Sequence, residues 1–140
     1  MSARTFIDTN VLVYLFDDSE PKNRDKARRR LEAAHEISEL VVSTQVLQEL
    51  YVALTRGSDP IASTAVAAEA VREVACFTVV QIDAPLIFAA IDGHRRNRIS
   101  FWDALIVSAA VEAGCGALLS EDLHAGQEID GLRVENPFAA

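Results

Sequence analysis

The chain has 140 residues, half of them hydrophobic, which predicts one globular domain with a sizeable core. Its formal net charge of −8 excludes the class of proteins that bind nucleic acid through electrostatic attraction alone, because those proteins are basic. No apolar run approaches the roughly 20 residues of a membrane span, and Asp8 interrupts the apolar N-terminal stretch. We therefore expect neither a membrane segment nor a signal peptide, and a cytoplasmic location.

The chain opens with a strand that leads directly into a helix. Residues 4–7 form a short apolar run with β-branched and aromatic side chains, which is typical of a buried strand. The run ends at Asp8, and apolar residues at helical spacing follow Thr9 and Asn10. Asp8 thus lies at the carboxyl end of a strand, where ligands bind in open parallel sheets. Asp is also a favoured N-cap residue, so capping explains Asp8 as well as catalysis does at this point.

The rest of the chain alternates between helices and strands. We expect further strands at residues 40–43, 77–82 and 116–120, and an edge strand at 132–134. We expect helices at 22–37, at 44–56 with Thr44 as cap, from Ser58 to about Ala75, at 84–96 after Asp83, and at 101–113 after Ser100. The helix at 22–37 carries a basic cluster that is either a solvated face or a contact for RNA or a partner. This order predicts an α/β fold with a central parallel sheet of 4–5 strands and helices on both faces.

Carboxylates follow the strands and helix starts at several points. Asp122 follows the fourth strand as Asp8 follows the first, and the two strand ends share one edge of a parallel sheet. Asp103 lies in the first turn of an almost wholly apolar helix, which we expect to be buried. A buried carboxylate requires a hydrogen-bond set, a metal or an ion pair, for which arginines just before the helix are available. Helical periodicity alone leaves Glu49 as an ordinary surface carboxylate.

Carboxylate oxygens are the ligands that Mg²⁺ and Mn²⁺ prefer. Two carboxylates at strand ends and one at a helix N-terminus therefore suit an open metal site. Scattered caps and surface acids are the alternative interpretation of the same residues.

Four motifs together resemble the PIN domain, and more narrowly a VapC-type toxin, the ribonuclease of a bacterial type II toxin–antitoxin pair. The motifs are Phe6-Ile7-Asp8-Thr9-Asn10, Gln48-Glu49-Leu50, Ser100-Phe101-Trp102-Asp103-Ala104-Leu105-Ile106 and Leu119-Ser120-Glu121-Asp122-Leu123. The resemblance covers residues 1–140, and Asp122 is matched by its spacing from Ser120.

The resemblance implies a catalytic, metal-binding set of four carboxylates: Asp8, Glu49, Asp103 and Asp122. It implies cleavage of RNA phosphodiester bonds with Mg²⁺ or Mn²⁺ as cofactor. Thr9, Asn10 and Ser120 are then expected to form hydrogen bonds to the carboxylates or to a metal-bound water.

The resemblance also implies partners. VapC-type toxins form homodimers and are silenced by a cognate VapB-type antitoxin, whose C-terminal segment lies in a groove near the metal site. We expect Arg95, Arg96 and Arg98, just before the Asp103 helix, to hold RNA phosphates, although a solvated helix end is the plainer interpretation.

Two other functions compete with this one. A phosphohydrolase of the haloacid-dehalogenase kind also uses an Asp at a strand end, but requires a second Asp where this chain has Asn10. It also requires a late lysine, whereas the only lysines are Lys22 and Lys26. A catalytically diverged PIN domain that only binds RNA or protein is the second alternative, although all four acids are present.

Overall fold

The computed structural model describes residues 3–139 and contains a six-stranded sheet with the order β3-β2-β1-β4-β6-β5. The strands are β1 (Arg4–Ile7), β2 (Glu39–Ser43), β3 (Thr78–Val80), β4 (Ala117–Leu119), β5 (Glu128–Ile129) and β6 (Leu132–Glu135). Every neighbouring pair is parallel except β5 with β6. The predicted α/β fold with a central parallel sheet is confirmed, and the antiparallel strand β5 is added at one edge.

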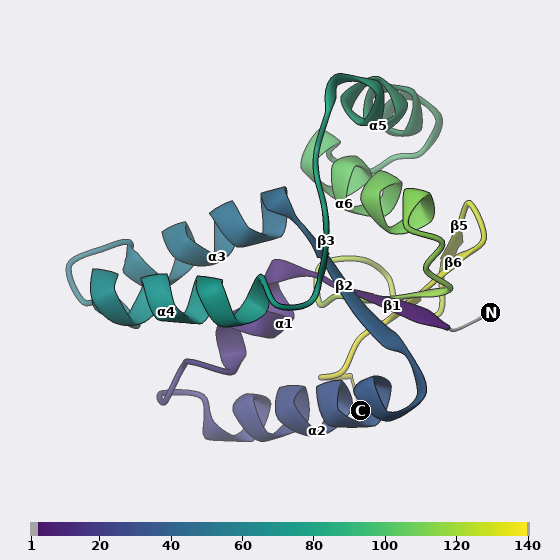
Figure 1. Ribbon diagram of the computed structural model, residues 1–140. Helices are drawn as coiled ribbons and strands as arrows, with labels where there is room; N and C mark the ends of the chain where they lie inside the picture. Colours follow the sequence, from purple (N-terminus) through teal and green to yellow (C-terminus); the bar gives the residue numbers. More distant parts are fainter. Residues whose placement is uncertain (1–2, 140) are drawn as a thin grey trace.

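The helices cover both faces of the sheet. They are α1 (Thr9–Tyr14), α2 (Pro21–Ile37), α3 (Thr44–Thr55), α4 (Thr64–Val74), α5 (Ala84–Arg96) and α6 (Phe101–Glu112). In Figure 1, α2 lies on one side of the strands, whereas α5 and α6 lie on the other, with α5 outermost. In residues 3–139 the structure has no helix with the length and apolar character needed to cross a membrane.

The sheet has one strand more than the four to five predicted, and β6 is not its edge. The extra strand, β5, pairs antiparallel with β6 through a two-residue turn at Asp130 and Gly131. Both turn residues have positive φ, 51° and 84°, as a type I′ hairpin requires. β6 therefore lies between β4 and β5.

Two helix starts also differ from the predictions. The cap of α3 is Ser43, whose hydroxyl accepts a hydrogen bond from the Val46 amide, rather than Thr44. Helix α4 begins at Thr64 instead of Ser58, because Ser63 supplies its cap and the Ala62 amide donates back to the Leu54 carbonyl of α3. Residues 57–63 consequently form a loop beside the C-terminal end of α3.

The central strands are buried on both faces, as in other parallel sheets. Phe6 and Ile7 of β1 and Leu118 and Leu119 of β4 are 0% exposed. Ile7 is paired with Leu119, and the Asp8 amide donates to the Leu119 carbonyl over 2.9 Å. This register places the residues that follow β1 and β4 next to each other at the carboxyl edge of the sheet.

Candidate active site

Asp8 is the most buried carboxylate of the predicted set. It caps α1, and its Oδ1 accepts a hydrogen bond of 2.7 Å from the Thr9 amide. Its Oδ2 accepts one of 2.8 Å from the Ser120 hydroxyl, and only 5% of the residue is exposed. Asp8 therefore caps α1 and also lies at the carboxyl edge of the sheet, as the sequence predicts.

The surroundings of Asp8 disfavour its ionised form. Burial raises the pKa of Asp8 from 3.8 to about 7 against the opposing effect of the Ser120 and Thr9 hydrogen bonds. The negative charges of Asp122 and Glu49 add to the increase. Asp8 thus lies where a nearby positive charge would have a large effect on its protonation.

The turn after β4 is tied to the start of α1. The Ser120 hydroxyl accepts a hydrogen bond of 3.2 Å from the Asp122 amide and donates to Asp8. The side-chain oxygen of Asn10 accepts one of 3.1 Å from the Glu121 amide. Ser120 thus links the carboxylate of Asp8 to the backbone of Asp122.

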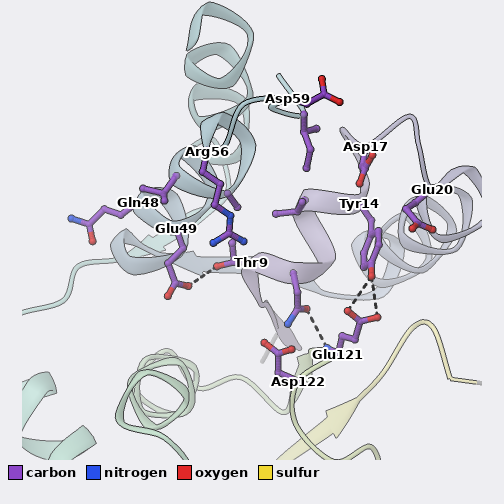
Figure 2. A pocket seen from close by; sticks show the side chains of 15 residues that line it. Thr9, Tyr14, Asp17, Glu20, Gln48, Glu49, Arg56, Asp59, Glu121 and Asp122 are labelled. Atoms are coloured by element: carbon purple, nitrogen blue, oxygen red, sulfur yellow. Dashed lines mark hydrogen bonds between the residues drawn. The ribbon is translucent and has the colours of Figure 1, made fainter. Parts of the chain in front are cut away.

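Glu121 lies beside Asp122 in sequence, but its side chain is held elsewhere. Tyr14 donates its hydroxyl to the two carboxylate oxygens of Glu121, at 3.1 and 3.2 Å, as Figure 2 shows. The Glu121 side chain therefore points toward α1.

Glu49 reaches the site from the first half of α3. Its Oε1 accepts a hydrogen bond of 2.8 Å from the Thr9 hydroxyl. Its Oε2 accepts one of 3.3 Å from the Gln45 amide group, which also donates over 3.2 Å to the backbone oxygen of Trp102. Glu49 is therefore held between α1 and the first turn of α6.

Asp103 is half-buried in the first turn of α6, where its amide donates to the Ser100 hydroxyl over 3.0 Å. Burial raises the pKa of the Asp103 carboxyl, partly offset by Ser100, and the charges of Asp122 and Glu49 raise it further. The charges of Glu49 and Asp122 thus raise the pKa of both Asp8 and Asp103. The four carboxylates therefore lie near one another and form one group.

Two open pockets meet at this group. The main pocket, a cavity of about 790 Å³, is lined by Thr9, Asn10, Glu49, Arg56, Glu121 and Asp122 among others. The side pocket, of about 500 Å³, includes Arg98, Ser100, Asp103 and Asp122 in its lining. Because Asp122 lines both pockets, a ligand long enough to pass from one to the other would cross Asp122.

The donor set fits a hard divalent cation in its chemistry. Within residues 3–139, none of the ion pairs involves Asp8, Glu49, Asp103 or Asp122. In that same range no three His, Cys, Asp or Glu side chains stand close enough together to ligate a metal as they are. The oxygen donors that Mg²⁺ and Mn²⁺ prefer are thus present on these four residues, but their side chains are not gathered around a cation in this structure.

The three arginines predicted to contact RNA are separated in the structure. Arg98 lines the side pocket with Asp103 and Asp122. Arg96 lies 3.8 Å from the Asp130 carboxylate, in a different pocket that includes Val111. Arg95 is exposed near the end of α5. Of the three, Arg98 is the one beside the carboxylates.

Three features of the site escaped the sequence analysis. Arg56 is the only Lys or Arg that lines the main pocket in the described chain, and Figure 2 shows its side chain extending into it. Gln45 bridges Glu49 and Trp102. Both stand at helical spacing from Glu49, seven residues after and four before it, which was a usable signal. Trp102, expected to be buried with its helix, is 62% exposed.

The sheet order and the four carboxylates at its carboxyl edge define an α/β protein with a clustered acidic site. A family model, the PIN domain, matches residues 5–127, and the chain belongs to this family.

Solved structures share its fold. One is a chain of VapBC2 from Rickettsia felis, solved bound to a DNA fragment from the VapBC2 promoter. Its sequence is 19% identical, the TM-score is 0.71, and the match covers 95% of this chain and 98% of that chain. Another is a chain of a toxin–antitoxin complex from Klebsiella pneumoniae. Its sequence is 18% identical, the TM-score is 0.67, and the match covers 97% of this chain and 99% of that chain.

VapC20 from Mycobacterium tuberculosis, described as a sarcin-ricin loop cleaving toxin, is 21% identical with a TM-score of 0.61, over 81% of this chain and 86% of that chain. At these identities the likeness concerns the fold. Among curated protein sequences no relative matches this chain.

Proposed function

We propose that this protein is a Mg²⁺- or Mn²⁺-dependent endoribonuclease that acts as the toxin of a VapBC-type pair. The observation that carries the proposal is the group of four carboxylates at the carboxyl edge of a PIN-domain sheet, with a side chain from each of α3 and α6 joining those that follow β1 and β4. The fold shared with VapC20, described as a sarcin-ricin loop cleaving toxin, supports RNA as the substrate.

In this proposal Asp8, Glu49, Asp103 and Asp122 hold the cation. When bound, Mg²⁺ or Mn²⁺ would lower the pKa of a water, orient it and neutralise charge that develops on the phosphate. Hydrolysis then forms a bond from the water oxygen to phosphorus while the phosphorus–oxygen bond to the leaving nucleoside breaks and that oxygen takes up a proton.

The uncharged neighbours keep the carboxylates in place. Ser120 links Asp8 to the Asp122 backbone, and Thr9 holds Glu49. The Asn10 amide nitrogen is buried without a hydrogen-bond partner in residues 3–139, so it is an unpaired donor on a residue that lines the main pocket. In this proposal Arg98, which lines the side pocket, holds an RNA phosphate, and Arg95 and Arg96 are more distant contacts.

The first experiment is cleavage of a total cellular RNA pool by the purified protein with Mg²⁺, with Mn²⁺ and with chelator. We expect metal-dependent cleavage that Asp8→Asn and Asp103→Asn abolish. Asp59→Asn is the control, because Asp59 lines the main pocket with Glu49 and Asp122 but lies outside the group of four. Cleavage that survives in the two site variants would contradict the proposal, as would RNA binding without cleavage, which indicates a binding module.

The second experiment addresses the partners. The fold shared with chains of toxin–antitoxin complexes supports a cognate VapB-type antitoxin and a homodimer. Induced expression of the protein should arrest growth, Asp8→Asn should relieve the arrest, and co-expression of the product of the adjacent gene should also relieve it. A monomer in light scattering, both alone and with that product, would contradict this part of the proposal.

A further inference from the structure

The side pocket differs from the main pocket in its charge. Six Asp and Glu residues line the main pocket, and four of them lie outside the group of four carboxylates: Asp17, Glu20, Asp59 and Glu121. The side pocket is lined by Asp103 and Asp122, which are cation ligands in the proposed function, and by Arg98. Among its described lining residues there is no other Asp, Glu, Lys or Arg. Once a cation offsets the two ligands, an RNA strand therefore meets less electrostatic repulsion in the side pocket than in the main one.

Arg98 has no competing ionic partner. None of the ion pairs within residues 3–139 involves Arg98, whereas Arg96 lies 3.8 Å from the Asp130 carboxylate. The Arg98 guanidinium is therefore available to a phosphate.

The rest of the side pocket presents hydrogen-bonding groups. Amide, hydroxyl and imidazole groups line it, from Asn97, Ser100, His124 and Gln127. The carboxamide oxygen of Gln127 is buried and has no hydrogen-bond partner in the part of the chain that the structure describes. A buried acceptor without a partner costs free energy, so a donor on a ligand in this pocket would be stabilised there. The volume of about 500 Å³ lies in the range of pockets that hold a small organic group.

One wall of the side pocket is the connection between α5 and α6. Residues 97–100 form this connection, and His94 of α5 donates from Nδ1 to the Ile99 carbonyl over 2.6 Å. The Ser100 hydroxyl then caps α6. The backbone that carries Asn97 and Arg98 is thus attached to both helices.

The opposite wall is a turn that precedes β5. The Gln127 amide donates to the His124 carbonyl over 3.2 Å, and Gly126 between them has a φ of 81°, which glycine adopts without strain. The Gly126 amide donates to the Val134 carbonyl of β6 over 2.8 Å. The sheet therefore fixes the backbone from which His124 and Gln127 project.

We propose that the side pocket binds the nucleotide next to the scissile phosphate and reads its base by hydrogen bonds. This inference rests on the proposed ribonuclease function and adds base specificity to it. Arg98 holds the phosphate of this nucleotide, and the carboxamides of Asn97 and Gln127 contact the base. Such contacts require an unstacked base, so the substrate is single-stranded at this position.

The first measurement is the base preference of cleavage. The wild type, with Mn²⁺, is incubated with short single-stranded RNAs of randomised sequence, and the ends of the products are sequenced. We expect a preferred base at one position next to the cut. Asn97→Ala and Gln127→Ala should each reduce this preference about fivefold or more while cleavage continues. Gln48→Ala is the control, because Gln48 carries the same carboxamide but lines the main pocket and not the side pocket.

The second measurement separates the phosphate contact from the base contacts. In the Asp8→Asn background with excess Mn²⁺, where RNA stays intact, anisotropy of labelled RNA gives the affinity at several salt concentrations. Arg98→Gln should weaken binding of all sequences alike and reduce the slope of log affinity against log salt by roughly 0.7. Gln127→Ala should keep the slope and weaken binding of the preferred sequence alone. Arg95→Gln is the matched control, because Arg95 is equally exposed but lines neither pocket.

The outcomes distinguish this inference from the proposed function. Cleavage without a base preference, or a preference that both side-pocket variants retain, would overturn the inference and leave the ribonuclease standing. A preference lost in Gln48→Ala instead, or an unchanged salt slope in Arg98→Gln, would also overturn it. If the wild type cuts no RNA, base-selective binding that Gln127→Ala removes would support the role of the pocket and overturn the ribonuclease. Equal binding of all sequences would overturn both.

Discussion

The Thr9 hydroxyl donates a hydrogen bond of 2.8 Å to Oε1 of Glu49, a residue 40 positions further along the chain. Thr9 is also the residue whose amide donates to Asp8. One residue therefore orients a carboxylate that follows β1 and another that comes from α3. The same bond explains why Glu49, which periodicity leaves as a surface acid, points into the site.

Replacing Thr9 with valine removes this hydroxyl at nearly constant shape. Thr9 is 8% exposed, so the fold has little room to compensate. We expect kcat/KM for RNA cleavage to fall about tenfold, as for other residues that orient metal ligands, while Thr9→Ser retains most activity. Steady-state rates and melting temperatures of both variants test this. Equal activity of the valine and wild-type proteins would show that Glu49 needs no such support.

Asp8 should make the metal-free protein less stable as pH rises. Its pKa is about 7 in the folded state against 3.8 ordinarily, so between these values the folded chain retains a proton that the unfolded chain has released. The contribution of Asp8 to the free energy of unfolding is fully present below about pH 4 and is lost by about pH 7. Its full size is on the order of 4 kcal/mol. Asp8→Asn removes this dependence.

Urea unfolding in chelator at pH 4.5 and pH 7.5 measures that difference. The wild type should lose more stability than Asp8→Asn over this interval, and Asp59→Asn should behave as the wild type does. An identical pH dependence in wild type and Asp8→Asn would mean that Asp8 is ionised in the folded protein without any cation.

Cation binding should be linked to the same proton. Mg²⁺ or Mn²⁺ ligation requires ionised Asp8, so binding should release protons below about pH 7 and tighten as pH rises. The increase in melting temperature on adding Mn²⁺ should be larger at pH 8 than at pH 6, and small in Asp103→Asn. Calorimetry in two buffers of different ionisation enthalpy counts the protons. A stabilisation independent of pH would refute the linkage.

Ser120→Ala should move the pH dependence of cleavage. The fully buried Ser120 hydroxyl lowers the pKa of Asp8, so its loss should shift the acidic limb of the rate profile to higher pH. Ser43→Ala is the control, since Ser43 is equally buried but caps α3. The control should lose stability without moving the limb. An unshifted limb in Ser120→Ala would contradict the assignment of that limb to Asp8.

Much of the fold follows from the sequence because local signals and tertiary packing agree. The end of β1 at Asp8 and the caps Asp83 and Ser100 were all readable from residue type and spacing. The start of α4 was not, because Pro60 gives a plausible helix start that the loop packed on α3 overrides. β5 was missed although Asp130-Gly131 is a strong hairpin signal, since a two-residue strand has almost no periodicity of its own.

The candidate site also combines features that the sequence predicts with features that depend on tertiary geometry. That Asp8 and Asp122 meet follows from parallel strands ending at one edge. That Glu49 joins them depends on the angle at which α3 leaves β2, and the sequence supplied it only through family resemblance. The separation of Arg98 from Arg96 depends on how residues 97–100 turn between two helices, and no residue pattern there specifies it.

The central claim, that four carboxylates form one cation site, is tested most directly by Mn²⁺ binding measured by electron paramagnetic resonance on the purified protein. Asp8→Asn, Glu49→Gln, Asp103→Asn and Asp122→Asn should each weaken binding at least tenfold. Glu121→Gln should bind as the wild type does, because Tyr14 holds the Glu121 carboxylate. Undiminished binding in any of the four, or its loss in Glu121→Gln, would contradict the account.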